Sequence, residues 1–240
     1  MGCREEFLQK LSSRFSVSGK HWLCGLEPGF GNRSSAEWAQ EFPRNLKELA
    51  PDIRENPTSF LRRYPYGRAQ IRVCAAYLGA PKGVSMDEAL RFLEAARFKV
   101  TDFNLYPLPF WKFADNHWLE MGASELTGIA SKQEYRTLCE QLLHSEFRRN
   151  LQESPPDWIL CFGTSHRKFF TSAFAPPEDI REEQSVTLCE GDKAFTVTQI
   201  SLKSVSTQIF VAPHPSSPTG LNSSAKRFAL GKYMREVLPQ

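Results

Sequence analysis

Three polar residues follow apolar runs in distant parts of this 240-residue sequence, and together they suit a hydrolytic reaction. The carboxylate of Glu27 can orient and deprotonate an attacking water. The imidazole of His214 can donate a hydrogen bond to an atom on which negative charge accumulates. The amide of Asn104 can donate and accept at once, which suits recognition of a polar ring. Taken singly each residue is ordinary, because such side chains also cap backbone amides, satisfy loops and close turns.

Buried strands are expected to position these residues. The apolar runs that predict strands lie at residues 21–26, 98–104, 158–162 and 208–212. Tight loops rich in glycine or proline follow the first, third and fourth runs. Ligands of open α/β sheets bind beyond the carboxyl ends of the strands. The loops at Glu27, Asn104, Gly163 and His214 are therefore expected to meet at one crevice.

Helices are expected between these strands. Ser85 with Glu88 and Ser131 with Glu134 predict two capping boxes, each at the start of an apolar helical stripe. Further helices are expected at 7–15, packed on the sheet, and at 167–173 and 223–238. A hairpin is expected within 186–200. Between residues 33 and 84, only 71–78 has a regular pattern. This alternation predicts a single domain over residues 1–240, a three-layer α/β/α fold around a central, mostly parallel four-stranded sheet.

The composition excludes several classes of protein. No stretch approaches the roughly 20 apolar residues that span a bilayer. The N-terminus carries Glu5 and Glu6 where a secretory signal would be basic and then apolar. We therefore expect a cytoplasmic protein, associated with the nucleoid if it is bacterial. The six cysteines form no C-x-x-C pair, so we expect reduced core residues, no metal site and no cofactor.

The distribution of charge is more informative than its total. A net charge of +3 and a pI of about 8.5 are too mild to indicate nucleic-acid binding by themselves. Residues 60–72 are rich in arginine and tyrosine, and Lys226, Arg227, Lys232 and Arg235 lie near the C-terminus. Both sets are candidate phosphate contacts, and both are equally compatible with an ordinary solvated surface.

Three motifs in order resemble the uracil-DNA glycosylase superfamily. G-L-E-P-G at 25–29 resembles its first motif, which is G-Q-D-P-Y-H in one branch and G-M-N-P-G or G-I-N-P-G in others. F-N-L-Y-P-L-P-F at 103–110 resembles the N-x-C-P-L-x-F stretch of the single-strand-selective monofunctional branch, with Tyr106 where cysteine is usual. H-P-S at 214–216 resembles the closing motif. The resemblance implies the uracil-DNA glycosylase fold and a monomeric enzyme that flips a base out of DNA and hydrolyses its N-glycosidic bond.

The resemblance also implies a role for each of the three polar residues. Hydrolysis of a glycosidic bond passes through a sugar cation and an anionic leaving base. Glu27 occupies the position of the residue that activates water, and His214 that of the donor to the base oxygen. Asn104 would read the Watson–Crick edge of a flipped pyrimidine. No lysine stands where a Schiff-base nucleophile is expected, so the enzyme would be monofunctional.

Further residues of the motifs would surround the base and the DNA. Gly29, Phe30 and Phe103 are candidates for contact with the base, and Trp38 and Phe42 are further candidates for the ring that stacks on it. The remaining DNA contacts are expected from the loop after the third strand, the closing loop and the last helix: Ser165, Ser216, Leu221, Lys226 and Arg227. Leu221 would act as a wedge that enters the duplex and fills the space left by the flipped base.

Two departures from the family pattern bear on the substrate. Glu27 is one methylene longer than the usual Asp or Asn. Gly29 stands where the branch most selective for uracil has a tyrosine that blocks substituents on the C5 carbon of the pyrimidine. These departures favour a 5-modified pyrimidine as the substrate and, because some viral genomes carry such bases, a role against viral DNA. Uracil excision in base-excision repair and a catalytically inactive DNA-binding member of the superfamily are the alternatives.

Overall fold

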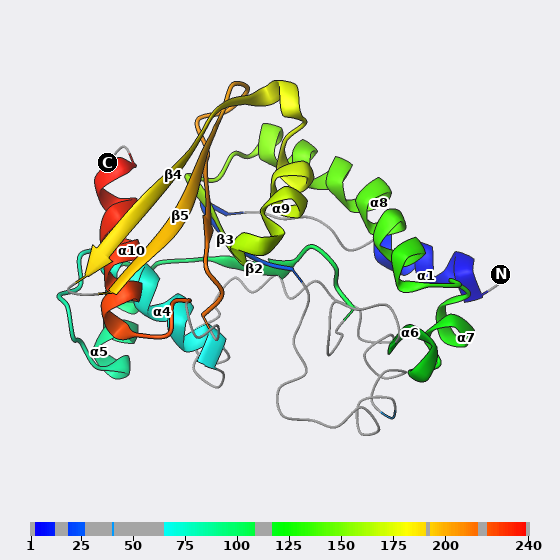
Figure 1. The fold of residues 1–240 in the computed structure, drawn as a ribbon, viewed down its shortest axis with the longest axis horizontal. Helices are drawn as coiled ribbons and strands as arrows, with labels where there is room; N and C mark the ends of the chain where they lie inside the picture. Colours follow the sequence, from blue (N-terminus) through cyan, green and yellow to red (C-terminus); the bar gives the residue numbers. More distant parts are fainter. Residues whose placement is uncertain are drawn as a thin grey trace.

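A six-stranded sheet forms the centre of the protein in the computed structural model, which describes residues 3–12, 19–26, 40, 65–108, 117–190, 193–215 and 220–238 (Figure 1). The strands lie in the order β2-β1-β3-β6-β5-β4. Four are parallel to one another: β2 (Thr101–Asn104), β1 (His21–Gly25), β3 (Trp158–Phe162) and β6 (Gln208–Ala212). These are the four strands that the sequence predicts.

The predicted hairpin belongs to the same sheet. It consists of β4 (Ile180–Glu190) and β5 (Lys193–Leu202), and β5 pairs with β6 in the antiparallel sense. The hairpin is longer than the predicted segment, and it raises the number of strands from the expected four to six. The predicted fold class, α/β with a mostly parallel sheet between helices, is confirmed.

The helices cover both faces of the sheet (Figure 1). On one face lie α4 (Pro65–Tyr77), α5 (Met86–Ala95) and α10 (Ser224–Val237). On the other lie α8 (Lys132–Glu153) and α9 (Arg167–Phe174). Three short helices complete the second side: α1 (Cys3–Ser12), α6 (His117–Glu120) and α7 (Ala123–Thr127). The N-terminal helix α1 is predicted to pack on the sheet. It packs instead on α7 and α8, where Phe7 contacts Tyr135.

Both capping serines begin their helices as predicted. The Ser85 hydroxyl accepts a hydrogen bond from Glu88 N (3.2 Å), and the Glu88 carboxylate accepts one from Ser85 N (2.8 Å), so the box of α5 is complete. The Ser131 hydroxyl likewise accepts from Glu134 N (3.1 Å). The Glu134 carboxylate accepts instead from Ala130 N (3.0 Å), and its other oxygen pairs with Arg4. The second box is thus half formed because Glu134 also holds α1 to α8.

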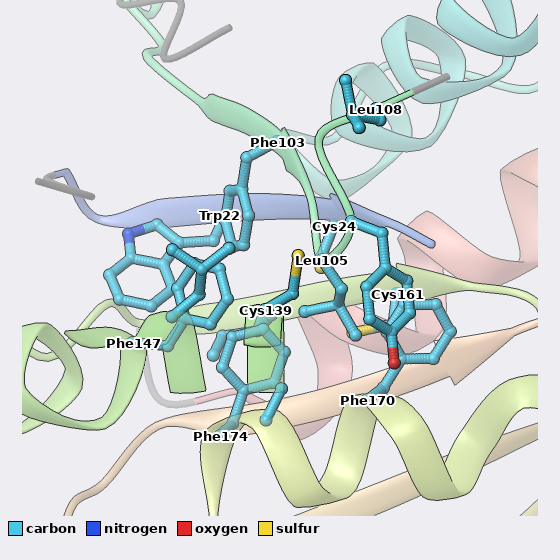
Figure 2. Packing of buried hydrophobic residues seen from close by; sticks show 14 of the residues in the cluster. Trp22, Cys24, Phe103, Leu105, Leu108, Cys139, Phe147, Cys161, Phe170 and Phe174 are labelled. Atoms are coloured by element: carbon cyan, nitrogen blue, oxygen red, sulfur yellow. The ribbon is translucent and has the colours of Figure 1, made fainter. Parts of the chain in front are cut away.

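Alternating strand residues divide the core into two clusters. Trp22 and Cys161 face α8 and α9, where they pack with Phe103, Phe147 and Phe174 (Figure 2). The intervening residues, including Leu23, Leu160 and Phe162, face α4, α5 and α10. A sheet that is buried on both faces explains why the strands of the sequence are almost continuously apolar.

Helix α4 runs antiparallel to the four parallel strands. Its last residue, Tyr77, packs against His21 and Trp158, the first residues of β1 and β3. Near its start, Tyr66 packs against Phe162, the last residue of β3. The beginning of α4 therefore lies at the carboxyl edge of the sheet. Within the described ranges, no helix combines the length and apolar character that crossing a membrane requires.

Helices α4 and α10 approach closely at Gly231. A Cβ at this position would lie 2.3 Å from Val73 O, 2.7 Å from Ala76 Cβ and 2.8 Å from Tyr77 N. These are atoms of the α4 backbone and of a short side chain, so they can give way only if the two helices separate. The absence of a side chain at Gly231 thus sets the distance between α4 and α10.

We predict that Gly231→Ala destabilises the protein, although alanine is the better helix former by about 1 kcal/mol. The overpacked contact with α4 should lower the free energy of unfolding by about 1–3 kcal/mol, measured by urea denaturation. Lys232→Ala, an exposed neighbour on the same helix, is the control and should change stability by less than about 0.5 kcal/mol. A more stable Gly231→Ala protein would contradict the close approach of the helices.

Candidate functional site

The carboxyl ends of the parallel strands bring the three sequence motifs to one edge of the sheet. Gly25 and Asn104 are partners in the register of β1 and β2. Beyond the strands, Leu105 N donates to Gly25 O (3.0 Å) and Tyr106 N donates to Leu26 O (2.9 Å). The first and second motifs are thus joined by backbone hydrogen bonds up to the point where the chain enters residues 27–39, which lie outside the described residues.

Asn104 lies directly over the backbone of the first motif. A Cβ at Gly25 would be only 2.1 Å from Asn104 Oδ1 and 3.4 Å from the hydroxyl oxygen of Tyr66. Only glycine therefore leaves room for the Asn104 amide in this position. The glycine that opens the first motif and the asparagine of the second form one unit, and Tyr66 of α4 lies beside it.

His214 of the closing motif reaches the same place through Tyr66. Their rings stack with centroids 5.5 Å apart and planes 29° apart. His214 is exposed, so the site is open to solvent. The protein on the covered side of its ring desolvates the imidazole, and this effect, followed by the charge of nearby His166, lowers the pKa of His214. At neutral pH its ring is uncharged and can donate one hydrogen bond.

A second layer of aromatic and charged residues supports His166. The Tyr106 hydroxyl donates to the Glu140 carboxylate of α8 (2.9 Å), and the Arg136 guanidinium lies over the Tyr106 ring at 5.8 Å. The Tyr106 ring packs on Phe169, which in turn packs on His166. Burial and then the charge of Arg136 lower the pKa of His166. Tyr106 of the second motif thus connects the site to α8.

Three arginines gather beside the site, where α4 meets the start of α10. Arg72 Nη1 donates to Ser224 Oγ (2.7 Å), and Arg227 Nε donates to Leu221 O (2.8 Å). Burial, and then the positive charges of Arg72 and Arg68, lower the pKa of Arg227. Among the described residues no carboxylate forms an ion pair with any of the three. This arginine cluster (Arg68, Arg72 and Arg227) is a local excess of positive charge that favours an anion.

Other predicted site residues lie elsewhere. Phe103 is buried on the opposite face of β2 from Asn104, within the aromatic core of Figure 2, and this position does not fit contact with a base. Leu221 is fully buried in the core beside α4 and α10, which does not fit a wedge that enters DNA. Lys226 is also buried, and its ammonium donates to Gly220 O (3.2 Å). Ser165 is exposed in the turn after β3, where DNA contact stays a prediction.

Several predicted residues lie outside the described residues, and the structure does not test them. They are Glu27, Gly29, Phe30, Trp38, Phe42 and Ser216. Conversely, the structure adds Tyr66 and His166 to the site. Tyr66 belongs to the arginine- and tyrosine-rich segment at 60–72, which the sequence indicates only as candidate phosphate contacts, and His166 is a single histidine in a loop.

A separate hollow lies between α8, α9 and β4, with a volume of about 300 Å³. It is lined by Arg148, Arg167, Lys168 and Glu183 among others. Arg167 pairs with Glu183 (2.9 Å), and Arg148 donates to Ser172 O, so two of its cations already have partners. It contains no residue of the three motifs, and the candidate site is therefore the carboxyl edge of the sheet.

Comparisons with known proteins do not assign a family. No model of a known protein family matches the chain, and no curated protein matches its sequence. The interpretation of the site thus depends on the motifs and on the geometry with which they meet.

We predict that Gly25→Ala destabilises the protein through Asn104. The added methyl overlaps the Asn104 amide, so the free energy of unfolding should fall by about 1–3 kcal/mol. In an Asn104→Ala background the same change should cost less, with a coupling of about 1 kcal/mol or more in a double-mutant cycle.

A Lys232→Ala background is the control for this cycle, because Lys232 is exposed on α10, outside β1 and β2. It should leave the cost of Gly25→Ala unchanged. Equal costs in all three backgrounds would show that Asn104 does not occupy the space beside Gly25.

Proposed function

We propose that the protein is a monofunctional DNA glycosylase of the uracil-DNA glycosylase superfamily. One observation carries the proposal: three motifs far apart in the sequence, represented by Gly25, Asn104 and His214, meet at the carboxyl edge of four parallel strands. Ligands bind at this edge in open α/β sheets. The side chains there combine an amide that recognises a ring with a neutral imidazole that can stabilise a leaving group.

The reaction needs little beyond these groups. The oxygen of a water attacks the C1′ carbon of the sugar as the bond from C1′ to the base nitrogen breaks, and the electron pair of that bond leaves with the base. In this proposal Glu27 accepts the proton of the water, and His214 donates a hydrogen bond to the base oxygen that becomes negative. Asn104 holds the flipped base by donating and accepting on its polar edge. The products are a free base and an abasic site.

The arginine cluster supports DNA as the partner. A duplex or a single strand presents a row of phosphates, and cations without a carboxylate partner among the described residues can bind them without first breaking such an ion pair. Arg68 and Arg72 lie on α4 and Arg227 lies in the first turn of α10, where Arg72 contacts Ser224 and Arg227 contacts Leu221. DNA phosphates that bind there would place a flipped nucleotide near the motif residues.

The proposed substrate is a 5-modified pyrimidine, with uracil as the alternative. The proposal depends on Gly29, because glycine leaves space beside C5 where a tyrosine would fill it. Space at C5 permits a larger base without requiring one, so the two substrates must be compared directly.

We predict that Glu27→Gln and His214→Ala each lower the single-turnover rate of base release by about a hundredfold to a thousandfold, because both act on charge that develops in the transition state. DNA affinity, measured by fluorescence anisotropy, should change little, since it depends on many phosphate contacts. His21→Ala, at the opposite edge of the sheet, is the control. DNA binding without any base release by the unmodified protein would favour the inactive DNA-binding alternative.

We predict that Gly29→Tyr selectively impairs excision of a bulky base. Overpacking a formed pocket costs about 1–3 kcal/mol, so the rate on 5-hydroxymethyluracil should fall roughly tenfold to a hundredfold relative to the rate on uracil. The measurement compares single-turnover rates on matched oligonucleotides that differ only in the base. Equal losses on both substrates would show that Gly29 does not border C5.

A further inference from the structure

The hydroxyl of Tyr66 is a buried polar group without a hydrogen-bond partner among the described residues. It lies at the centre of the candidate site, 3.4 Å from the position of a Cβ on Gly25, which in turn would overlap Asn104 Oδ1. Leaving such a group unpaired is unfavourable, because it has given up its hydrogen bonds to water and gained none in return. Buried hydroxyls in proteins are nearly always paired, so this one calls for a partner beyond the described residues.

The tyrosine ring is fixed on two sides. It contacts Phe162 edge to face, with centroids 5.3 Å apart and planes 73° apart, and it stacks on His214. One turn further along α4, Gln70 Nε2 donates to Asp102 Oδ1 of β2 (3.1 Å) and holds the helix in register with the sheet. The hydroxyl is therefore held in place and cannot turn away to find another partner without loss of this packing.

The hydroxyl is also kept protonated. Burial, followed by the negative charge of Asp102, raises the pKa of Tyr66 well above its ordinary value. At neutral pH the group is a phenol that offers one proton. The acceptors that fit it are neutral or negative oxygens, such as the carbonyl oxygen of a pyrimidine or the hydroxyl of a C5 substituent.

We infer that Tyr66 is a base-contacting residue whose hydroxyl donates a hydrogen bond to an oxygen of the flipped pyrimidine that Asn104 holds. The inference rests on the proposed function. The base is favoured over a phosphate because the hydroxyl is buried beside Asn104 and Gly25, whereas the arginine cluster lies at the junction of α4 and α10. Tyr66 would thus act from the helix, opposite the strand that carries Asn104, and would restrict the orientation of the base.

The first test measures binding without catalysis. The probes are oligonucleotides with uracil or 5-hydroxymethyluracil on a 2′-fluoroarabinose, whose fluorine resists formation of the sugar cation, and an oligonucleotide with a tetrahydrofuran abasic analogue. The unmodified protein should bind the base-bearing probes more tightly than the abasic one. Tyr66→Phe should weaken binding of the base-bearing probes about threefold to tenfold, the effect of one hydrogen bond, and leave the abasic probe unaffected.

Tyr77→Phe is the matched control, because it removes a hydroxyl from the same helix at the opposite edge of the sheet. It should change no affinity. Equal losses on the two base-bearing probes would assign the bond to a ring carbonyl, and a larger loss on 5-hydroxymethyluracil would assign it to the substituent. Either result supports the inference.

The second test uses the free protein and does not depend on the function. Because the Tyr66 hydroxyl has no partner among the described residues, Tyr66→Phe should leave the melting temperature unchanged or raise it. Tyr233→Phe is the comparison, since the Tyr233 hydroxyl donates to Gln199 and its loss should lower the melting temperature. A decrease for Tyr66→Phe as large as that for Tyr233→Phe would show a structural partner and overturn the inference.

The outcomes separate the two proposals. If the unmodified protein prefers base-bearing probes and Tyr66→Phe keeps the full preference, the inference fails and the glycosylase proposal stands. If the unmodified protein has no such preference and releases no base, the proposed function fails and the inference fails with it.

Discussion

The parallel pairing of β2, β1, β3 and β6 is the constraint on which the site depends. Because the four strands run in one direction, the segments that follow them leave the sheet at the same edge. Reversing any one strand of about five residues would move its loop roughly 17 Å, to the opposite edge. The parallel arrangement requires long crossover connections, and the helices of these connections cover both faces of the sheet.

The alternation of side chains along each strand then decides which residues enter the site. In β2, Phe103 joins the core shared with α8 and α9, and its neighbour Asn104 faces the side of α4. In β3, Cys161 and Phe162 separate in the same way between the two cores. One face thus supplies a closed aromatic core, and the other supplies the polar groups at the carboxyl edge together with the helix that packs over them.

Helix α4 both packs closely against α10 and contributes side chains to the site. Its close approach to α10 at Gly231 brings Arg68 and Arg72 near Arg227, where three positive charges repel one another. Its antiparallel direction places Tyr66 at the carboxyl edge. Within the described residues the helix thus holds a group of like charges and a buried hydroxyl without a hydrogen-bond partner, and both arrangements are unfavourable unless a bound group compensates them.

The sequence alone determined the elements whose signals are local. Continuous apolar runs predicted the four parallel strands, and capping serines located the starts of α5 and α8, because such signals depend on neighbours within a few residues. Two site residues that the structure describes, Asn104 and His214, were found through motifs that follow these strands.

Only the tertiary structure decided which residues meet. It placed the hairpin in the sheet, buried Phe103 and Leu221, and brought Tyr66 and His166 to His214. No local pattern contains these facts, because the face that a residue presents depends on strand register, and contacts across the sheet depend on helix packing between segments far apart in the chain. The sequence therefore predicts that a site exists at this edge, and the packing of α4 against the sheet and α10 decides what surrounds it.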